Sequence, residues 1–364
     1  MSSDRIRGFK DWYIRHERRI SSGALLFGFI FDNLTLKRID LLYENIVLAS
    51  YLIIAALSIT LVNLYETGKI RGRFFSWIYE VLPLILQFSF GALFSGFFVF
   101  YSRSGTVAGS WVFLVIILGL LVGNEFLRRR YLRLTFQVAV LFLALFSYAI
   151  FFTPVLLGKM GVGVFILSGI ISIVAIYVFL RLLAFLMPNR IAPMRPILTA
   201  VIAGIFSLVN LLYFGNVIPP IPLSLKHADV YHNVTKLPDG NYELTKENQK
   251  WYERFRRYDT FHWQEGESVY VFSAVFAPTR LQTDIAHNWQ YFDEQTKEWK
   301  SVNKIKFPIV GGRDGGYRGY SYKQNIFAGR WRVDIETLRG ALIGRVKFQV
   351  VESDERPEFE KVIQ

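Results

Sequence analysis

Apolar residues are distributed unevenly along this chain of 364 residues. Before Lys226 they form long continuous blocks, and after it they form short alternating runs interrupted by charged residues. The change falls in the segment NVIPPIPLSLK, whose three prolines cannot continue a helix and favour extended backbone. This pattern predicts an α-helical membrane region followed by a separate all-β region.

Six apolar blocks have the length of a membrane-spanning helix. Each is close to the ~20 residues that cross the ~30 Å hydrocarbon core as a helix. The blocks are residues 41–64, 81–101, 106–124, 134–157, 161–180 and 197–214. Length and apolar composition therefore predict six spans.

A seventh candidate span, residues 20–36, is shorter and would extend only ~25 Å as a helix. Basic residues favour counting it, because Lys and Arg accumulate on the cytoplasmic side in short loops. With seven spans, sixteen of the basic residues before Lys226 fall on one face and four on the other, whereas six spans give ten and ten. We predict seven spans, the first either fully spanning or re-entrant. The N-terminus would then be cytoplasmic and residues after Lys226 extracytoplasmic.

After residue 230 the sequence has the period of two that is typical of strands. The run SVYVFSAVF is almost wholly apolar, as in a strand buried in a sandwich. HNWQYFDEQTKEWKSVNKIKF predicts two strands with a turn at 293–297, and GRWRVDIETLRGALIGRVKFQV predicts a hairpin with its turn at 338–340. Repeated short strands predict an Ig-like antiparallel β-sandwich. Only NQKWYERFRRYDTF stays open between strand, short helix and loop.

These patterns divide the chain into five parts. Residues 1–19 form a basic cytoplasmic segment, expected as an interfacial helix with Trp12 and Tyr13 at the lipid headgroups. The other expected parts are a transmembrane helical domain at 20–218, a proline-rich linker at 219–229, an extracytoplasmic β-sandwich at 230–352 and a polar tail at 353–364.

The net charge of +13 changes this picture little once the charged residues are counted separately in the two parts of the chain. Residues 1–225 hold 20 Lys and Arg against 9 Asp and Glu, and the remainder holds 22 against 20. The excess therefore lies beside the spans, where membrane proteins place basic residues, and we expect membrane lipids rather than nucleic acid as partners. The chain contains no cysteine, which excludes disulfides and thiolate chemistry.

No motif in the sequence predicts an enzyme. The loop GGRDGGYRG has the glycines of a phosphate-binding loop, but it lacks the following Lys-Ser or Lys-Thr and precedes a strand-like run. His227, His232, His262 and His287 do not have metal-ligand spacing. We therefore predict no catalytic residue, metal or cofactor. Five tryptophans after Lys226 are expected mainly in the core, with sugar-binding platforms as the alternative.

Three polar residues inside apolar blocks are candidate functional positions, because polar groups in hydrocarbon are costly. Asp32 is either a polar cap paired with Lys37 or Arg38, or a buried carboxylate that contacts a ligand. Gln87 and Asn210 lie near mid-span, where helix-to-helix hydrogen bonds are their ordinary use.

A cationic and aromatic cluster in the β region is the second candidate site. Arginine binds carboxylate or phosphate with two parallel hydrogen bonds, and tyrosine combines an apolar face with a hydroxyl. Such a surface would bind an acidic glycan, a lipid headgroup or an envelope protein. Alternatively, the glycines shape the turn and the arginines pair with Asp314, Asp334 or Glu336. The cluster comprises Arg313, Tyr317, Arg318, Tyr320, Tyr322, Lys323 and Arg330.

The segments IPPIPLSLKHADVYHNV, GGRDGGYRGYSYK and GRWRVDIETLRGALIGRVKFQV resemble bacterial membrane proteins that end in domain of unknown function 2914. GFIFDNLTLKRID resembles the helical part of such proteins. The resemblance implies a bacterial inner-membrane protein of the cell envelope and brings no assigned activity.

The sequence thus predicts a non-enzymatic membrane protein whose β-sandwich binds or scaffolds a partner. The alternative is that the helical bundle handles a lipid or a lipid-linked substrate, as an enzyme or flippase, through Asp32 with Gln87 or Asn210.

Overall fold

The fold is given by a computed structural model of the chain. It describes residues 29–30, 32–34, 36, 42–103, 107–126, 133–220, 222–248, 258–279, 281–313, 315–355 and 357–364. Two compact units divide the chain. The helical unit contains Met1–Ser102, Trp111–Thr153 and Val162–Phe214, and the β unit contains Gly215–Gln364 with two short segments, Arg103–Ser110 and Pro154–Gly161. The expected interfacial helix, most of residues 20–36, and most of NQKWYERFRRYDTF lie outside the described residues.

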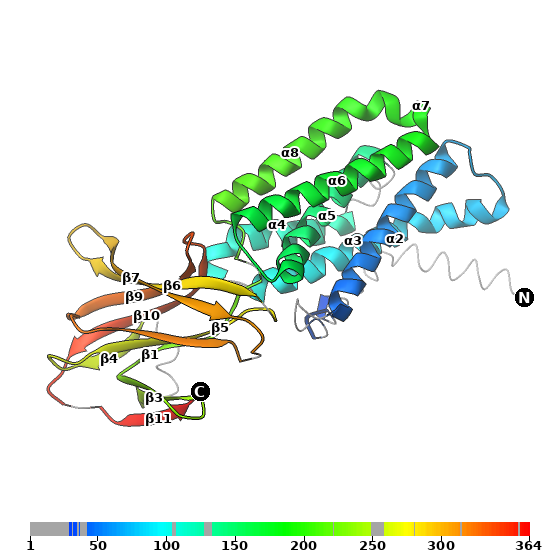
Figure 1. The fold of residues 1–364 in the computed structure, drawn as a ribbon. Coiled ribbons are helices and arrows are strands. Elements are labelled where there is room, and N and C mark those ends of the chain that lie inside the picture. Colours follow the sequence, from blue (N-terminus) through cyan, green and yellow to red (C-terminus); the bar gives the residue numbers. More distant parts are fainter. Residues whose placement is uncertain are drawn as a thin grey trace, which may run out of the picture. The chain divides into compact units, whose positions relative to one another are not determined.

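Each of the six apolar blocks forms a helix (Figure 1). The helices are α2 (Leu42–Glu66), α3 (Arg73–Arg103), α4 (Val107–Phe126), α5 (Leu134–Leu157), α6 (Val162–Leu186) and α8 (Arg195–Phe214). The short helices α7 (Pro188–Ile191) and η2 (Ala192–Met194) join α6 to α8.

Five helical segments in the described part of the chain are long and apolar enough to span a membrane, and Trp111–Gly123 within α4 is a shorter apolar segment. The prediction of long apolar helices in this region is confirmed, and the seven membrane spans stay a prediction. Helix α3 begins at Arg73, earlier than the block at 81–101. Its first turns are held by Tyr79, which donates to Glu66 Oε1 at 3.0 Å and stacks on Tyr65.

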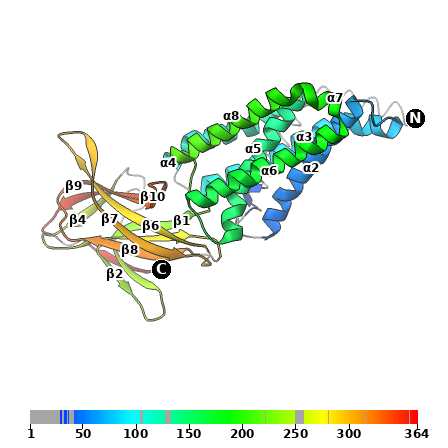
Figure 2. The ribbon, with the colours of Figure 1, turned by 45° about the horizontal axis from the view of Figure 1, so that its top comes forward.

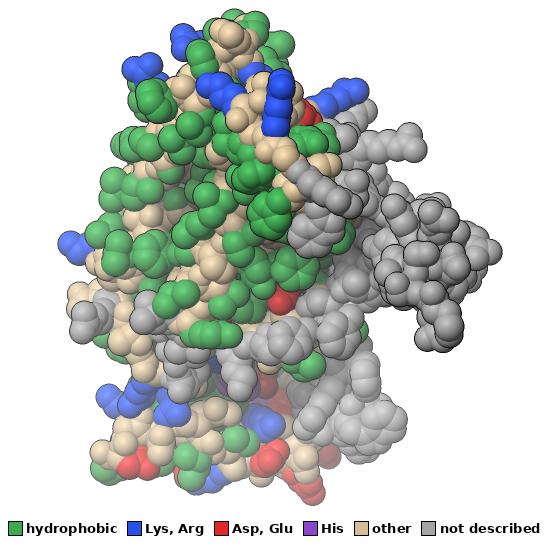
Figure 3. Space-filling model, turned by 90° about the vertical axis from the view of Figure 1, so that its right-hand side faces the viewer, with side chains coloured by type: hydrophobic (Ala, Val, Ile, Leu, Met, Phe, Trp, Pro, Cys, Tyr) green, Lys and Arg blue, Asp and Glu red, His purple; other side chains and the backbone are tan. Residues whose placement is uncertain are grey.

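Apolar side chains cover the outside of the helical unit, and lysines and arginines gather at one end of it (Figure 3). Phe185 is 82% exposed and Leu211 is 71% exposed, which suits contact with lipid rather than water. Inside the unit, the fully buried Asn63 donates from Nδ2 to Gln137 Oε1 at 2.8 Å and so joins α2 to α5. Such an amide pair is a common means of helix association in hydrocarbon.

The β unit contains eleven strands in the part of the chain that the structure describes, arranged in three sheets. The first sheet has the order β4-β10-β9-β6-β7, the second β1-β5-β8 and the third β11-β3-β2. The strands are β1 (Ser224–Tyr231), β2 (Asn233–Lys236), β3 (Tyr242–Glu247), β4 (Asp259–Trp263), β5 (Val269–Phe276), β6 (Gln282–Asp293), β7 (Glu298–Val310), β8 (Tyr317–Lys323), β9 (Gly329–Thr337), β10 (Leu342–Glu352) and β11 (Phe359–Ile363).

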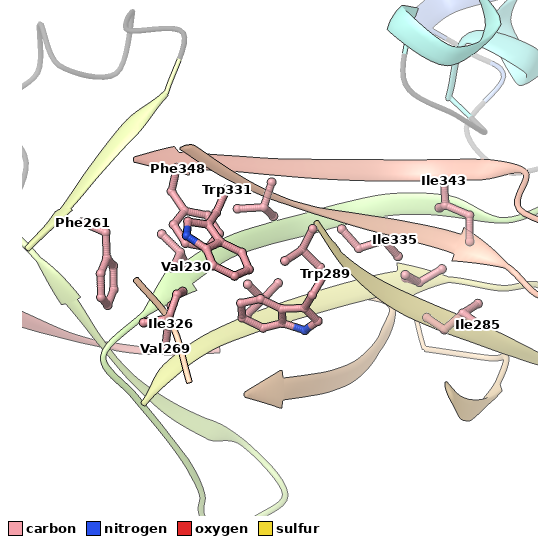
Figure 4. Packing of buried hydrophobic residues seen from close by; sticks show 14 of the residues in the cluster. Val230, Phe261, Val269, Ile285, Trp289, Ile326, Trp331, Ile335, Ile343 and Phe348 are labelled. Atoms are coloured by element: carbon pink, nitrogen blue, oxygen red, sulfur yellow. The ribbon is translucent and has the colours of Figure 1, made fainter. Parts of the chain in front are cut away.

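The three sheets form three layers (Figures 1 and 2). The main core lies between the first and second sheets and contains the fully buried Trp289 and Trp331 (Figure 4). A smaller core lies between the second and third sheets and contains Phe272 and Leu244. Strand β5 is the middle strand of the middle layer, so both of its faces are covered. This position explains why SVYVFSAVF is apolar at nearly every residue.

The two predicted hairpins are confirmed. Strands β6 and β7 pair antiparallel around a turn at residues 294–297, and β9 pairs antiparallel with β10 around residues 338–341. Gly340 has a φ of 82°, and its amide donates to Thr337 O at 2.8 Å. A left-handed backbone conformation at this position favours glycine, so the glycine in the sequence indicated the turn.

The structure differs from the expected antiparallel two-sheet arrangement in several places. A third sheet is present, and β4 pairs parallel with β10. Strand β1 begins at Ser224, inside the range expected as a linker, and β11 lies inside the expected polar tail. Strand β1 follows closely on the prolines and β11 has only five residues, so neither gives a clear strand signal in the sequence. Each is held by pairing with another strand, β1 with β5 and β11 with β3.

Candidate functional site

The glycine-rich loop at residues 311–316 connects β7 to β8 and packs closely against the end of β5 and the residues that follow it. A methyl group on Gly311 would lie 1.7 Å from the carbonyl oxygen of Pro278, and Gly316 has a φ of 86°. The amide of Gly311 donates to Leu281 O at 2.8 Å, and that of Gly312 to Ala277 O at 3.2 Å. These amides are already bonded to the protein, so the loop acts as a strand connection rather than a phosphate cradle.

Strand β8 pairs antiparallel with β5 and is an edge strand of the second sheet. Its side chains alternate between two faces. Tyr317, Ser321 and Lys323 point towards the first sheet: Tyr317 packs on the main core, and the Lys323 ammonium lies 5.9 Å from the centroid of the Trp331 ring. Arg318, Tyr320 and Tyr322 share the opposite face.

The outer face of β8 carries a tyrosine cluster, which we define as Tyr242, Tyr270, Tyr320 and Tyr322. The ring centroid of Tyr270 lies 5.4 Å from that of Tyr322 and 6.2 Å from that of Tyr320, and Tyr242 lies 6.1 Å from Tyr320. Tyr320 is 39% exposed and Tyr322 is 51% exposed. Large aromatic surface therefore faces solvent at the edge of the second sheet.

Two arginines lie at one end of the tyrosine cluster. Arg318 Nη1 donates to Asn241 Oδ1 at 2.8 Å, and Arg313 is exposed. Burial raises the pKa of Tyr242, while the positive charges of Arg313 and Arg318 act to lower it. The sequence did not predict three residues of this surface, because they lie far from β8 along the chain. Tyr242 lies on β3, Tyr270 on β5, and Asn241 in the turn before β3.

A groove of about 590 Å³ runs beside the tyrosine cluster. It lies between β7 and β8, which are edge strands of the first and second sheets. Its polar lining includes Asn303 from β7, and Gln324 and Asn325, which follow β8; Tyr320, Tyr322 and Lys323 complete this side. The groove thus combines amide groups, aromatic rings and a cation, a composition common in binding sites.

The remaining member of the predicted cluster, Arg330, lies on β9 in a different sheet. Its Nη2 donates to Glu294 Oε1 at 2.5 Å, and its guanidinium lies 4.0 Å from the centroid of the Phe292 ring. The acidic partners expected for the cluster are engaged elsewhere: Asp334 accepts two hydrogen bonds from Arg345, and Glu336 pairs with Lys304 at 2.6 Å. Asp314 lies outside the described residues.

His287 is buried in the main core between two serines. Its Nε2 lies 2.8 Å from Ser273 Oγ and its Nδ1 lies 2.8 Å from Ser321 Oγ, which also accepts from Trp289 Nε1. Burial lowers the pKa of His287 to about 3. The ring is therefore neutral at physiological pH, and with no exposed surface it has a structural role.

A carboxylate and two histidines connect the third sheet to the first. Glu247 on β3 accepts from His232 at 3.0 Å and from His262 on β4 at 2.7 Å. Burial acts to raise the pKa of Glu247, but hydrogen bonds from both histidines hold it below its ordinary value. In the part of the chain that the structure describes, no group of three or more His, Cys, Asp or Glu side chains is arranged to hold a metal ion.

The three candidates inside the apolar blocks differ in their surroundings. Asn210 donates to Phe206 O of its own helix at 2.8 Å. Gln87 is buried on α3, and Asp32 lies near Ser95, which also belongs to α3. Its expected partners Lys37 and Arg38 lie outside the described residues. The Asn210 amide is thus engaged in its own helix, which gives the lipid-handling alternative less support than the β8 surface has.

Residues 282–350 match the family described as protein of unknown function (DUF2914). This range runs from the start of β6 almost to the end of β10, so the resemblance read from the sequence is confirmed for the C-terminal region. No curated protein matches the chain. Among solved structures, the alkylpurine DNA glycosylase AlkC of Pseudomonas fluorescens bound to DNA is 10% identical and covers 86% of this chain and 100% of its own. Its TM-score of 0.22 is too low to carry an argument.

Proposed function

We propose that this membrane protein presents its β unit, as an Ig-like binding domain, outside the cytoplasm of a bacterial cell. Seven spans in the inner membrane, with the N-terminus in the cytoplasm, would give this orientation. The proposal is supported by the apolar helices and by the division of basic residues, sixteen to four, between the two faces. The protein acts by binding a partner and has no catalytic role of its own.

The tyrosine cluster with Arg313 and Arg318 is the observation that carries this proposal. Tyr320 and Tyr322 expose large rings that the core does not use. Tyrosine and arginine, with tryptophan, are the side chains most enriched at the energetic centres of protein interfaces. The rings are held by neighbouring rings across strands β5 and β3, so little conformational entropy is lost when a partner covers them.

The partner that fits this surface is an acidic protein segment. The arginines at one end of the cluster favour carboxylates, and the groove between β7 and β8 is open to an extended chain. Backbone groups on the outer edge of β8 can pair with such a chain as an added strand. An acidic glycan or a lipid headgroup would satisfy the arginines but would make less use of the tyrosine rings.

Replacing both Arg313 and Arg318 with alanine is expected to weaken partner binding by about 30-fold, because two charge-assisted contacts at an interface together contribute about 2 kcal/mol. A photoreactive amino acid placed at Tyr322 of the full chain would report binding as a covalent adduct in intact membranes. Mass spectrometry of the adduct would show whether the partner is a protein, a glycan or a lipid.

Arg330→Ala is the matched control for this experiment, since it removes a positive charge from a different sheet. It should leave the adduct at Tyr322 unchanged. Thermal unfolding must show that the Arg313→Ala/Arg318→Ala variant remains folded, because Arg318 is bonded to Asn241. A folded variant that forms the adduct as well as the wild type would contradict the proposal, as would an adduct with lipid or glycan alone.

A further inference from the structure

A groove of about 610 Å³ opens at one end of the helical unit, between the start of α5 and the segment that leads into α8. Arg133 and Arg190 line it together with apolar side chains. The apolar part includes Phe136 and Ala139 of α5, Met194 of η2 and Val201 of α8. None of the described residues that line the groove is acidic. The groove is therefore cationic where the two arginines lie and apolar along the helices.

The two arginines have hydrogen-bonding capacity that no other described residue uses. Arg190 pairs with Glu66 through Nη2, but its buried Nε has no hydrogen-bond partner among the residues that the structure describes. A buried donor without an acceptor is costly, so an anion that reached it would be stabilised. Arg133 is exposed and forms no ion pair with a described residue.

The start of α5 adds a third positive feature. Arg133 precedes the helix, and its carbonyl accepts the amide of Gln137 at 3.0 Å. The first amides of a helix have no acceptor within it, and the helix dipole makes this end positive. Thr135 and Phe136, both of which line the groove, belong to this first turn.

We propose that this groove binds an anionic phospholipid. The phosphate would lie at Arg133, Arg190 and the start of α5, and an acyl chain would lie along Phe136, Ala139 and Val201. Charge complementarity selects the anionic headgroup, and the apolar floor requires a chain that a free phosphate lacks. Basic pockets between membrane helices are a recognised form of lipid site. The distribution of basic residues puts this end of the unit on the cytoplasmic face.

The test compares lipid binding by the full chain in detergent, measured by native mass spectrometry. Phosphatidylglycerol and phosphatidylcholine with identical acyl chains serve as probes. The wild type should prefer phosphatidylglycerol by about tenfold or more, and Arg133→Ala/Arg190→Ala should lose that preference. Arg181→Ala is the matched control: it removes a positive charge near the same end, from a side chain that lies over Tyr177, and should keep the preference.

The loss of Arg190 also breaks the ion pair with Glu66, so Glu66→Gln separates the two effects. This variant frees Arg190 without removing it and should keep or increase the preference for phosphatidylglycerol. Loss of the preference in Glu66→Gln would assign the effect to the ion pair and overturn the proposal. Equal binding of both lipids by the wild type, or equally strong binding of inorganic phosphate, would overturn it as well. The adduct at Tyr322 on β8 should be unaffected by these variants.

Discussion

Gly311→Ala is expected to destabilise the β unit by about 3 kcal/mol, the upper part of the range for adding a methyl group where no space exists. The new methyl group would lie 1.7 Å from the carbonyl oxygen of Pro278, which is backbone and cannot rotate away. The loop would have to move outward, and the hydrogen bond from the Gly311 amide to Leu281 would be lost. Strand β8 follows this loop, so the tyrosine cluster would be displaced with it.

Gly315→Ala provides a matched control in the same loop. No atom lies within 4 Å of the position that its methyl group would occupy, so its stability should stay within about 0.5 kcal/mol of the wild type. Urea unfolding of the full chain in detergent, followed by tryptophan fluorescence, measures both variants. Similar stabilities for Gly311→Ala and Gly315→Ala would show that the loop adapts and that the close approach to Pro278 is not required.

Acidification is expected to destabilise the folded protein through His287 alone by about 1.4 kcal/mol for each pH unit between pH 6.5 and pH 3. Burial lowers the pKa of His287 from 6.5 to about 3 in the folded state. The unfolded chain therefore takes up a proton below pH 6.5, while the folded chain stays neutral down to about pH 3. The contribution of His287 to the free energy of unfolding is complete above pH 6.5 and is lost progressively as the pH falls.

His287→Gln removes the titration while leaving an amide that can bond to Ser273 or Ser321. The variant should be less stable than the wild type at pH 7.5, and its free energy of unfolding should fall less steeply from pH 6 to pH 4. Other titrating groups, including Glu247, are common to both proteins and cancel in the comparison. Equal slopes for the two proteins would show that His287 is protonated in the folded state or lies in contact with water.

The helices could be read from the sequence because a continuous apolar block of about 20 residues is the length and composition of a membrane-spanning helix. The block at 134–157 coincides with α5 from end to end. Helix α3 was predicted too short because its first turns contain Glu80 and rely on Tyr65 and Glu66, which belong to another helix. The pair Asn63 and Gln137 was not predicted at all, since nothing in a sequence shows which two helices lie side by side.

Strand pairing in the β unit could be predicted where a strand pairs with the next strand along the chain. It could not be predicted where a strand pairs with one far away in the sequence. The hairpins at 294–297 and 338–341 were found from their turns and alternating residues. Strand β11 pairs with β3 across more than a hundred residues, and no local pattern marks such a pairing.

The candidate site was predicted in part. A period of two along β8 already separates Arg318, Tyr320 and Tyr322 from Tyr317 and Lys323, so the predicted cluster could have been divided from the sequence alone. The contributions of Tyr242 and Tyr270 depend on strand order, which the sequence does not show. Arg330 was included because it is close along the chain, yet the strand order of the sheets places it elsewhere.

The pairing of β11 with β3 also links the tyrosine cluster to residues that lie far along the chain. Strand β3 can pair with β2 as soon as both are synthesised, but its other edge waits until residues 359–363 have been made. Contacts so distant along the chain form slowly, because a long loop must close before they contribute. Tyr242 lies on this strand, and its amide bonds to Gln364 O at 2.9 Å. The strand that carries Tyr242 is therefore fully paired only once residues 359–363 are present, so the surface that we assign to partner binding depends on them.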